Sequence, residues 1–504
     1  MPRTIAMLLA ASLVCPGGAP AQGRLLPSVP QTLSLADAIE LATRFSPALR
    51  QFANDRGPAA WRVRNAYASF LPRFDASGSA QYSGSGSQTF LATEFEQPSS
   101  TIGSFYSLNL SMSLSGRTLT QPGLARAQLR AAEATITGAQ VNLESAIRRQ
   151  YLAVLQAEAQ VELAELQVRR NEEFLKLAQA RFDVGQNTML EVRQAEVAKG
   201  QAEVALIQAR QAVTVEKLRL FQQMGIVPPE DPSVVTLSDT FPIVEPVWAL
   251  GELLDEAEGS NPDLLALRAS GAAARATERA VKSTWLPTLS FSAGWSGFTQ
   301  QFTDVEPLVQ NAVVSAQRQA DAAVTECNLT NQIWLNPGLQ PLDCSLLAFT
   351  PAREDSLRAS IAAQNGGFPF DFTNQPFSAR LSVSLPIFTQ FSRPQQVAEA
   401  AAAADDAIEM VRARELQVQT EVSQAYYAML TAYETIGIQE SNRAAAREQL
   451  RLATERYRVG SGTSLELLDA QVAAQRAEAD YVNAVYQYHQ AIATLESAVG
   501  RPLR

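Results

Sequence analysis

The chain carries Arg-Tyr-Arg-Val-Gly at residues 456–460 and a close copy, Arg-Phe-Asp-Val-Gly, at residues 181–185, which is 275 positions earlier. A second pair of copies, Leu-Pro at 71–72 and again at 286–287, lies 215 positions apart. The offset therefore grows by about 60 positions within the second copy. Segments that recur in the same order, each at a fixed offset, are the signature of an internal repeat. The sequence predicts two similar halves, with one large insertion in the second half.

Prolines mark the border between the predicted halves. Residues 226–247 contain five prolines, so we predict an extended linker there. The first repeat then covers residues 22–225 and the second covers residues 248–504. The insertion falls at about residues 299–375. We expect it to be irregular, with a short helix at about residues 307–325.

Four segments alternate apolar residues with small polar ones, at about residues 73–83, 106–115, 288–298 and 377–386. A period of two is typical of strands with one apolar face. In a lipid-facing barrel the apolar face lies outside and the polar face lines the interior. A soluble sandwich shows the same alternation, so this alternative stays open from the strands alone.

Two stretches without interior proline, at about residues 122–181 and 394–456, predict long helices. Each has roughly 60 residues and a length on the order of 90 Å. Apolar residues in the second helix follow a 4-3 spacing over residues 397–436, and only Glu415 interrupts it. A period of 3.5 residues predicts helices that coil about partners.

Shorter helices complete each predicted half, at residues 47–70 and 188–224 in the first and 262–285 and 463–499 in the second. In each half the two short helices together match the long helix in length. The sequence therefore predicts a rod of paired helical columns, and the fold class is mainly α with a membrane β-barrel.

The first 21 residues have the features of a secretory signal peptide. A basic residue precedes an apolar run at residues 5–14, and Ala19-Pro20-Ala21 offers a cleavage site. Cys15 would be the site of lipidation in a lipoprotein, but the residues before it fit that signal poorly. The net charge of −10 argues against nucleic acid as a partner.

Cys327 and Cys344 remain after the predicted cleavage. In an exported chain, two cysteines in one segment predict a disulfide, and two free thiols are the alternative. The chain has a single histidine, His489, so a zinc site is not expected. We predict no metal, no cofactor and no catalytic site, so the chain is not expected to be an enzyme.

Four strands cannot close a membrane barrel, because known membrane barrels have at least about eight strands. An open sheet in lipid leaves two bare edges, and each unpaired backbone group costs several kcal/mol. An eight-stranded barrel from two copies is filled by side chains, and the polar residues here are too small to fill it. We therefore predict a homotrimer with a hollow 12-stranded β-barrel, four strands per chain, that continues into a long periplasmic α-helical barrel.

The predicted location follows from the strand pairs and the signal peptide. The chain leaves the cytoplasm, and no later stretch approaches the ~18–20 apolar residues of a membrane-spanning helix. We therefore expect the cell outer membrane, with outer-membrane lipid around the barrel and a large periplasmic part. Because helices flank each strand hairpin, both hairpin loops face outside, and the insertion is expected to be extracellular.

The chain resembles the TolC-like outer-membrane efflux protein family, the outer membrane factors. Residues 456–471 carry the resemblance, together with the twin segment at 181–185 and the opening at residues 35–47. The resemblance covers nearly all of the mature sequence and implies a passive trimeric exit duct. Such ducts are opened by docking to a periplasmic membrane-fusion adaptor and an inner-membrane pump of the RND, ABC or a similar class, or to a type I secretion system.

The resemblance also implies positions for a periplasmic gate. Glu466 and Asp469 are three residues apart on one helix, hence on one face, and the family places acidic residues at its constricted mouth. Tyr457 and Arg456 would be latch residues. Glu191 and Gln194 are the first-half equivalents of Glu466 and Asp469. An ordinary solvated helix face is the alternative for the acidic pair.

The same resemblance assigns adaptor docking to the helix tips, whose residues are Val184, Gly185, Val459 and Gly460. Two departures from the family pattern stand out. The exits from the second and fourth strands, residues 115–118 and 386–391, lack the family's Pro-Leu-Phe-Asp-Gly-Gly, and Gly462 occupies its basic latch position. The competing hypothesis is a trimeric adhesin or a structural envelope protein without a transport role.

Overall fold

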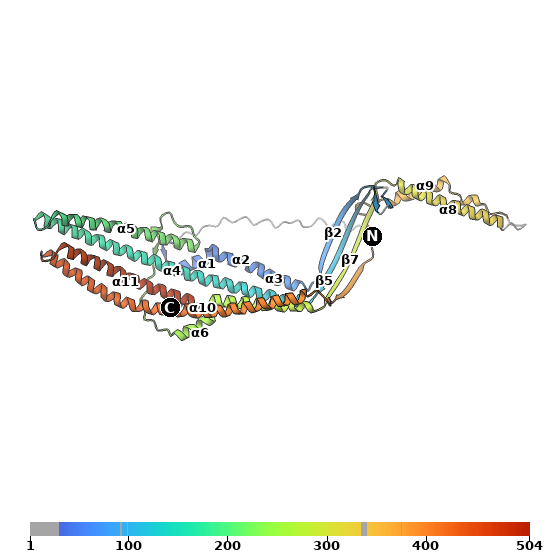
Figure 1. Ribbon diagram of the computed structural model, residues 1–504. Helices are drawn as coiled ribbons and strands as arrows, with labels where there is room; N and C mark the ends of the chain where they lie inside the picture. Colours follow the sequence, from blue (N-terminus) through green and yellow to red (C-terminus); the bar gives the residue numbers. More distant parts are fainter. Residues whose placement is uncertain (1–29, 91–92, 98, 334–339, 374, 504) are drawn as a thin grey trace. The chain divides into compact units, whose positions relative to one another are not determined.

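A computed structural model describes most of the chain (Figure 1). The described residues are 30–90, 93–97, 99–333, 340–373 and 375–503. The predicted signal peptide, with Cys15, lies outside them. The chain divides into two compact units, a helical unit (Met1–Val63, Gly123–Arg279, Gln396–Arg504) and a sheet unit (Arg64–Pro122, Ala280–Gln395).

Long antiparallel helices build the helical unit. Its helices, some of which extend a few residues past its limits, are α1 (Leu35–Phe45), α2 (Pro47–Asn54), α3 (Arg56–Ala68), α4 (Gly116–Asp183), α5 (Met189–Met224), α6 (Leu250–Ser260), α7 (Pro262–Lys282), α10 (Ser392–Arg458) and α11 (Ser464–Val499). The longest are α4 with 68 residues and α10 with 67. Figure 1 shows α5 running back along α4, and α11 running back along α10.

Local sequence signals fix most helix ends. Ser34 caps α1 through a reciprocal pair of hydrogen bonds with Asp37, and α5 and α11 end at glycines in the left-handed region. Two predictions need correction. The helix predicted at 47–70 is two helices that meet at Asp55. The helix predicted from residue 122 begins six residues earlier, at Gly116, and contains Pro122.

The predicted 4-3 spacing of α10 is confirmed in its central part. Its buried members are Ala404, Val418, Val422, Ala425, Met429 and Ile436. Most of them pack with α6 and α11 in one core that also contains Leu253, Tyr488 and Leu495. The exception in the pattern has a partner, because Glu415 Oε1 lies 2.7 Å from Arg268 Nη2 of α7. A polar residue in the spacing therefore marks an ion pair between helices.

The proline-rich linker is tied to the helical unit along its length. It contains a 3₁₀ turn at Pro232–Val234 and a short strand, β6 (Thr236–Leu237). This strand pairs in parallel with β1 (Thr32–Leu33), just before α1. The backbone groups of the linker thus find partners near the start of the described chain.

A four-stranded antiparallel sheet dominates the sheet unit, in the order β2-β5-β7-β8. Its strands are β2 (Arg73–Ser83), β5 (Thr101–Leu114), β7 (Thr288–Phe302) and β8 (Ser378–Ser384). The first predicted strand is confirmed at both ends. The second begins five residues earlier than predicted, the third ends four residues later, and the fourth is shorter. A small hairpin, β3 (Gly86–Phe90) and β4 (Thr93–Gln97), was not predicted.

The register separates two faces of this sheet. Ser107 pairs with Ser77 on one side and Ser296 on the other, whereas Leu108 pairs with Ala76 and Trp295. Directly paired residues point to the same face, so one face is small and polar and the other is apolar. The outer strands are open, and every residue of β8 is exposed.

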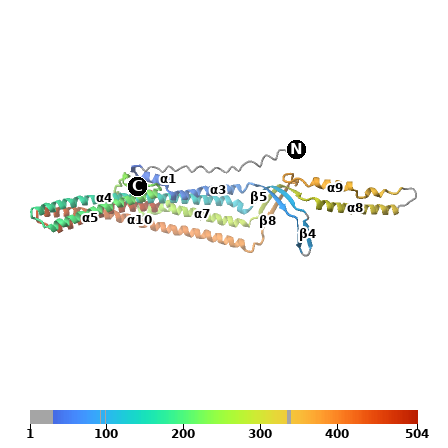
Figure 2. The same ribbon diagram turned by 90° about the horizontal axis from the view of Figure 1, so that it is seen from above.

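The insertion is largely helical, so the prediction of an irregular segment was wrong. It contains α8 (Glu306–Ile333), α9 (Pro351–Gln364) and a 3₁₀ turn at Cys344–Leu347. Figures 1 and 2 both show α8 and α9 side by side. A disulfide joins Cys327 of α8 to Cys344. The many alanines of α8 favour a helix and are the sequence signal for it.

Candidate functional site

Two loops form the tips of the helical hairpins, one between α4 and α5 and the other between α10 and α11. Both turn at a glycine with positive φ, 76° at Gly185 and 81° at Gly460, a conformation that side chains with a Cβ disfavour. The preceding residues, Val184 and Val459, are 69 % and 74 % exposed. Each tip therefore presents an apolar side chain to its surroundings.

Glu466 is held within the second loop. Its amide donates to Thr463 Oγ1 at 3.2 Å, so Thr463 caps α11. Its carboxylate forms an ion pair with Arg456. A carboxylate in the first turn of a helix also interacts favourably with the helix dipole. The structure thus brings two predicted site residues, Arg456 and Glu466, together across one loop.

Asp469 and Gln194, the other polar residues predicted near the tips, are exposed. Asp469 stands between Leu467 and Ala470, which are buried in the hydrophobic cluster beneath the tips. The carboxylate of Asp469 therefore points away from that cluster. Of the two predicted acidic positions in α11, Asp469 is the more accessible to an ion or solute.

Tyr457 is 1 % exposed and connects the two loops. The Arg181 guanidinium lies 4.6 Å from the centre of its ring, in the geometry of a cation–π interaction. Arg181 Nη1 also donates to the Tyr457 carbonyl at 2.5 Å. The ring of Phe174 packs against the ring of Tyr457, with 5.8 Å between the ring centres. A residue predicted as a latch is therefore buried between the two hairpins of one chain.

Asn187 extends this contact to the first loop. The Tyr457 hydroxyl lies 2.8 Å from the Asn187 amide. With the amide oxygen toward this hydroxyl, the amide nitrogen donates to Glu191 Oε2 at 3.0 Å. The Thr188 amide donates to the same oxygen at 3.1 Å. Glu191 is thus engaged in its own loop, and Asn187, which the sequence reading missed, links the two tips.

Buried polar contacts also hold the linker against the helices. Lys217 Nζ lies 2.8 Å from Glu158 Oε1 and donates to the Val235 carbonyl at 2.7 Å. The Tyr151 hydroxyl donates to the Leu33 carbonyl at 2.9 Å, and burial raises the pKa of Tyr151 well above its usual value. Sequence alone does not distinguish these side chains from exposed ones.

A second set of polar contacts joins α4 to α11. Arg148 forms an ion pair with Glu496, whose side chain is almost fully buried. Asn483 Oδ1 accepts hydrogen bonds from Gln156 and Gln160, both at 3.0 Å. Because α4 and α11 come from different predicted halves, these contacts cross-link the two halves within the helical unit.

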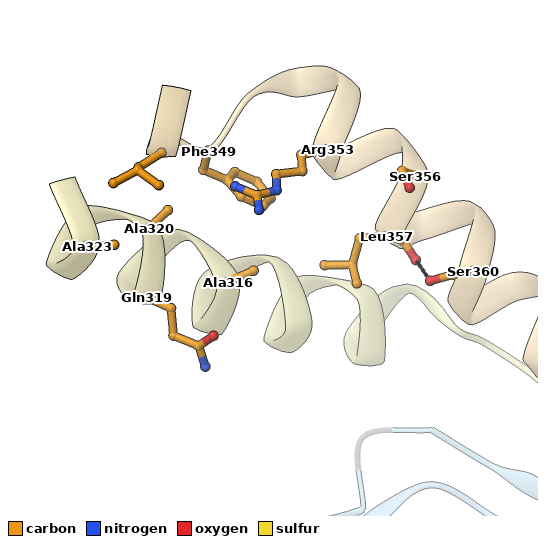
Figure 3. A pocket seen from close by; sticks show the side chains of 10 residues that line it. Ala316, Gln319, Ala320, Ala323, Phe349, Arg353, Ser356, Leu357 and Ser360 are labelled. Carbon is orange, nitrogen blue, oxygen red and sulfur yellow. Dashed lines mark hydrogen bonds between the residues drawn. The ribbon is translucent and has the colours of Figure 1, made fainter. Parts of the chain in front are cut away.

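A pocket of about 420 Å³ lies between α8 and α9. Figure 3 shows Ala316, Ala320 and Ala323 on its α8 side, with Arg353 and Leu357 of α9 opposite. The small alanine side chains leave this space between the two helices. The residues that line the pocket include no Asp, Glu or His, so they do not combine an acid, a base and a nucleophile.

Among the residues that the structure describes, no helix combines the length and the apolar character needed to cross a lipid bilayer. The same residues contain no cluster of three or more His, Cys, Asp or Glu side chains suited to a metal ion.

Residues 38–226 and 353–501 match the family model of outer membrane efflux proteins. No curated protein sequence matches the chain. Several solved structures share its fold. VceC of Vibrio cholerae is 18 % identical with a TM-score of 0.66, covering 93 % of this chain and 97 % of VceC. The open state of MtrE of Neisseria gonorrhoeae has the same identity and TM-score, and the match covers 93 % of this chain and 89 % of MtrE. CmeC of Campylobacter jejuni is 15 % identical with a TM-score of 0.67, and the match covers 92 % of this chain and 85 % of CmeC.

The fold is therefore that of the TolC-like outer-membrane channels. The chain belongs to the outer membrane efflux protein family, as the sequence reading expected. This family comprises passive channels of the outer membrane and not enzymes. The two matched ranges leave out residues 227–352, which include nearly all of the linker, α8 and the disulfide.

Proposed function

We propose that the chain is one protomer of a homotrimeric exit duct in the outer membrane, which serves a tripartite efflux or type I secretion system. The observation that carries the proposal is the open four-stranded sheet. Its outer strands, β2 and β8, each pair on one side only. In lipid, unpaired backbone groups cost several kcal/mol each, so the two edges need partners.

Three copies satisfy both edges at once. If β8 of each chain pairs with β2 of the next, the sheet closes as a barrel of 12 strands. The small polar face then lines a hollow interior, and the apolar face, with exposed Phe74, Tyr82 and Leu381, contacts lipid. Both strand hairpins then open outward, so α8 and α9 belong to the extracellular side.

The helical unit supports the same assembly. Several large apolar side chains on α5 and α10 are more than half exposed in the single chain: Val197, Val204 and Ile207 on α5, and Leu416, Tyr427 and Ile438 on α10. Exposed apolar surface on long helices is typical of contacts between protomers. We infer that neighbouring chains cover these residues and form a periplasmic α-helical barrel.

The tips are the proposed gate and docking site. Val184, Gly185, Val459 and Gly460 would meet the adaptor, and the exposed apolar valines suit such a contact. Asp469 and Glu466 of three chains would surround the axis, with Arg456 and Tyr457 holding the loops in place. Gln194 and Glu191 would be the corresponding residues of the first hairpin. An RND, ABC or similar inner-membrane pump would supply the energy.

Two measurements test the proposal. Purified protein added to a planar lipid bilayer should give discrete, stable conductance steps, because a closed barrel leaves a continuous aqueous path. A strain that lacks the gene should become more susceptible to at least one toxic compound, or should retain a secreted protein. A protein that gives no conductance and whose deletion changes neither susceptibility nor secretion would be an adhesin or a structural envelope protein instead.

A further inference from the structure

The polar face of the sheet contains a hollow of about 570 Å³. Gly294 of β7 lines it and pairs with Asn109 of β5 and Ser378 of β8. Strand β5 comes so close here that a Cβ on Gly294 would lie 2.4 Å from the Leu108 carbonyl oxygen. The floor of the hollow is therefore bare backbone, and hydroxyl and amide side chains surround it.

One end of the hollow is cationic. Arg380 of β8 lines it and lies in the same cross-strand row as Ser292, Ser111 and Arg73. The four strands contain three charged residues in total, Arg73, Asp75 and Arg380. Arg73 Nε lies 2.8 Å from Asp75 Oδ2. One carboxylate can neutralise only one of the two guanidinium groups, so the four strands carry one excess positive charge per chain.

The other end of the hollow is aromatic. Phe105 lines it and pairs across the strands with Phe298. Both side chains lie on the polar face and are 43 % exposed, although Ser107 and Ser296 occupy the next positions on that face. On the polar face, these two phenyl rings neither contact lipid nor fill a hydrophobic core, so their position there suggests another role.

We propose that this hollow is a binding site for small aromatic anions on their way through the duct. Arg380 binds the carboxylate, sulfonate or phosphate group, because a guanidinium donates two parallel hydrogen bonds to a planar oxyanion. Ser and Asn side chains donate further hydrogen bonds, and Phe105 packs against the aromatic ring of the ligand. The volume falls within the range of small-molecule sites.

This inference rests on the proposed function, since the polar face lines a bore only in a closed barrel. It adds a solute class that the fold alone does not specify. Three chains place three such hollows around one bore, each with an excess positive charge. An aromatic anion is then held long enough to obstruct ion flow, whereas a neutral aromatic molecule of the same shape is not.

The test is single-channel recording of the full-length protein with 2-naphthoate as the probe and neutral 2-naphthamide as its control. We expect 2-naphthoate to block the wild-type pore reversibly and 2-naphthamide to have no effect. Arg380→Gln should raise the blocking concentration at least tenfold, and Phe105→Ser about threefold. Arg380→Lys keeps the charge but loses the two-pronged geometry, so it should give an intermediate value. The block should persist at high pH because arginine stays protonated.

The matched control is Arg353→Gln, which removes an exposed arginine of α9 in the same unit and should leave the block unchanged. Each variant is first checked for the particle mass and conductance of the wild type. Normal conductance without 2-naphthoate block, or with equal block in Arg380→Gln, would overturn the binding site and leave the proposed duct standing. A folded particle without conductance would overturn both.

Discussion

The helix tips and the polar face of the sheet differ in how their charged side chains are held. At the tips, the carboxylate of Glu466 is joined to Arg456, and the carboxylate of Glu191 accepts hydrogen bonds from its own loop. The four strands of the sheet contain two arginines and one aspartate, and Asp75 lies beside Arg73. Two carboxylates at the tips are therefore held by groups of the same chain, whereas we propose that the second arginine of the sheet strands binds a solute.

This difference distinguishes charges held in contacts within the chain from charges that we propose act on a solute. Glu466 and Asp469 lie on the same face of α11, yet Glu466 pairs with Arg456 across the loop and Asp469 is exposed. In the sheet, Arg73 has a carboxylate beside it, and Arg380 lines the hollow with Phe105.

The largest effect is expected for Tyr457→Ala, which removes the buried ring between the two tips. Deleting a fully buried aromatic side chain costs about 3–5 kcal/mol. Local opening of the loops should therefore become more than a hundredfold easier, while the sheet is unaffected. Hydrogen exchange of the amides around residues 456–463 measures this change.

Tyr457→Phe is the control for that experiment, because it loses only the hydrogen bond to Asn187. It should increase exchange by about tenfold or less, since a single hydrogen bond contributes about 1 kcal/mol. Equal exchange in wild type and Tyr457→Ala would mean that the tips are not joined through this ring.

Next in size is removal of the disulfide by Cys327→Ser with Cys344→Ser. A loop closed over 17 positions corresponds to about 3 kcal/mol of lost unfolded-chain entropy. The helices α8 and α9 should become sensitive to protease at lower temperature. Conductance, block by 2-naphthoate and block by a trivalent cation should stay as in the wild type. A change in any of them would show that the insertion takes part in conduction.

A smaller effect is expected at the tips for Asp469→Asn. Removing the exposed carboxylate from three chains should weaken block by a trivalent cation about tenfold, which corresponds to 1.4 kcal/mol. Glu466→Gln should weaken it less, because Arg456 already neutralises Glu466. Equal effects of the two substitutions in single-channel recordings would contradict the distinction between them. Neither should alter block by 2-naphthoate.

The smallest effect is expected for Thr463→Ala, which removes the cap of α11. Loss of a capping side chain costs about 1 kcal/mol, so exchange of the first amides of α11 should rise about fivefold. Thr463→Ser keeps a hydroxyl acceptor and should restore slow exchange. If serine fails to restore it, the threonine hydroxyl is not the stabilising group.

Much of the fold could be predicted because the local signals agree with one another. Proline at position 72 precedes a strict alternation, and β2 begins at the next residue. The 4-3 spacing in α10 identified most of a real core. The insertion escaped prediction because its helices lack a long apolar stripe. They depend instead on alanine content and on the contact between α8 and α9.

The candidate site was predicted less completely. Spacing placed Glu466 and Asp469 on one face, but it does not show that Arg456, ten positions earlier and across a turn, reaches one of them and not the other. Arg181 belongs to the repeated pentapeptide, yet its contact with Tyr457 joins residues 276 positions apart. The hollow around Gly294 depends on cross-strand register, which one sequence does not fix.

The central claim is that the four strands of one chain are too few to close a barrel, and that three chains together form one 12-stranded barrel. Native mass spectrometry of the detergent-extracted protein tests it most directly. The account predicts one species with the mass of three chains, which dissociates only when the barrel unfolds. A stable, folded particle with the mass of a single chain would contradict it.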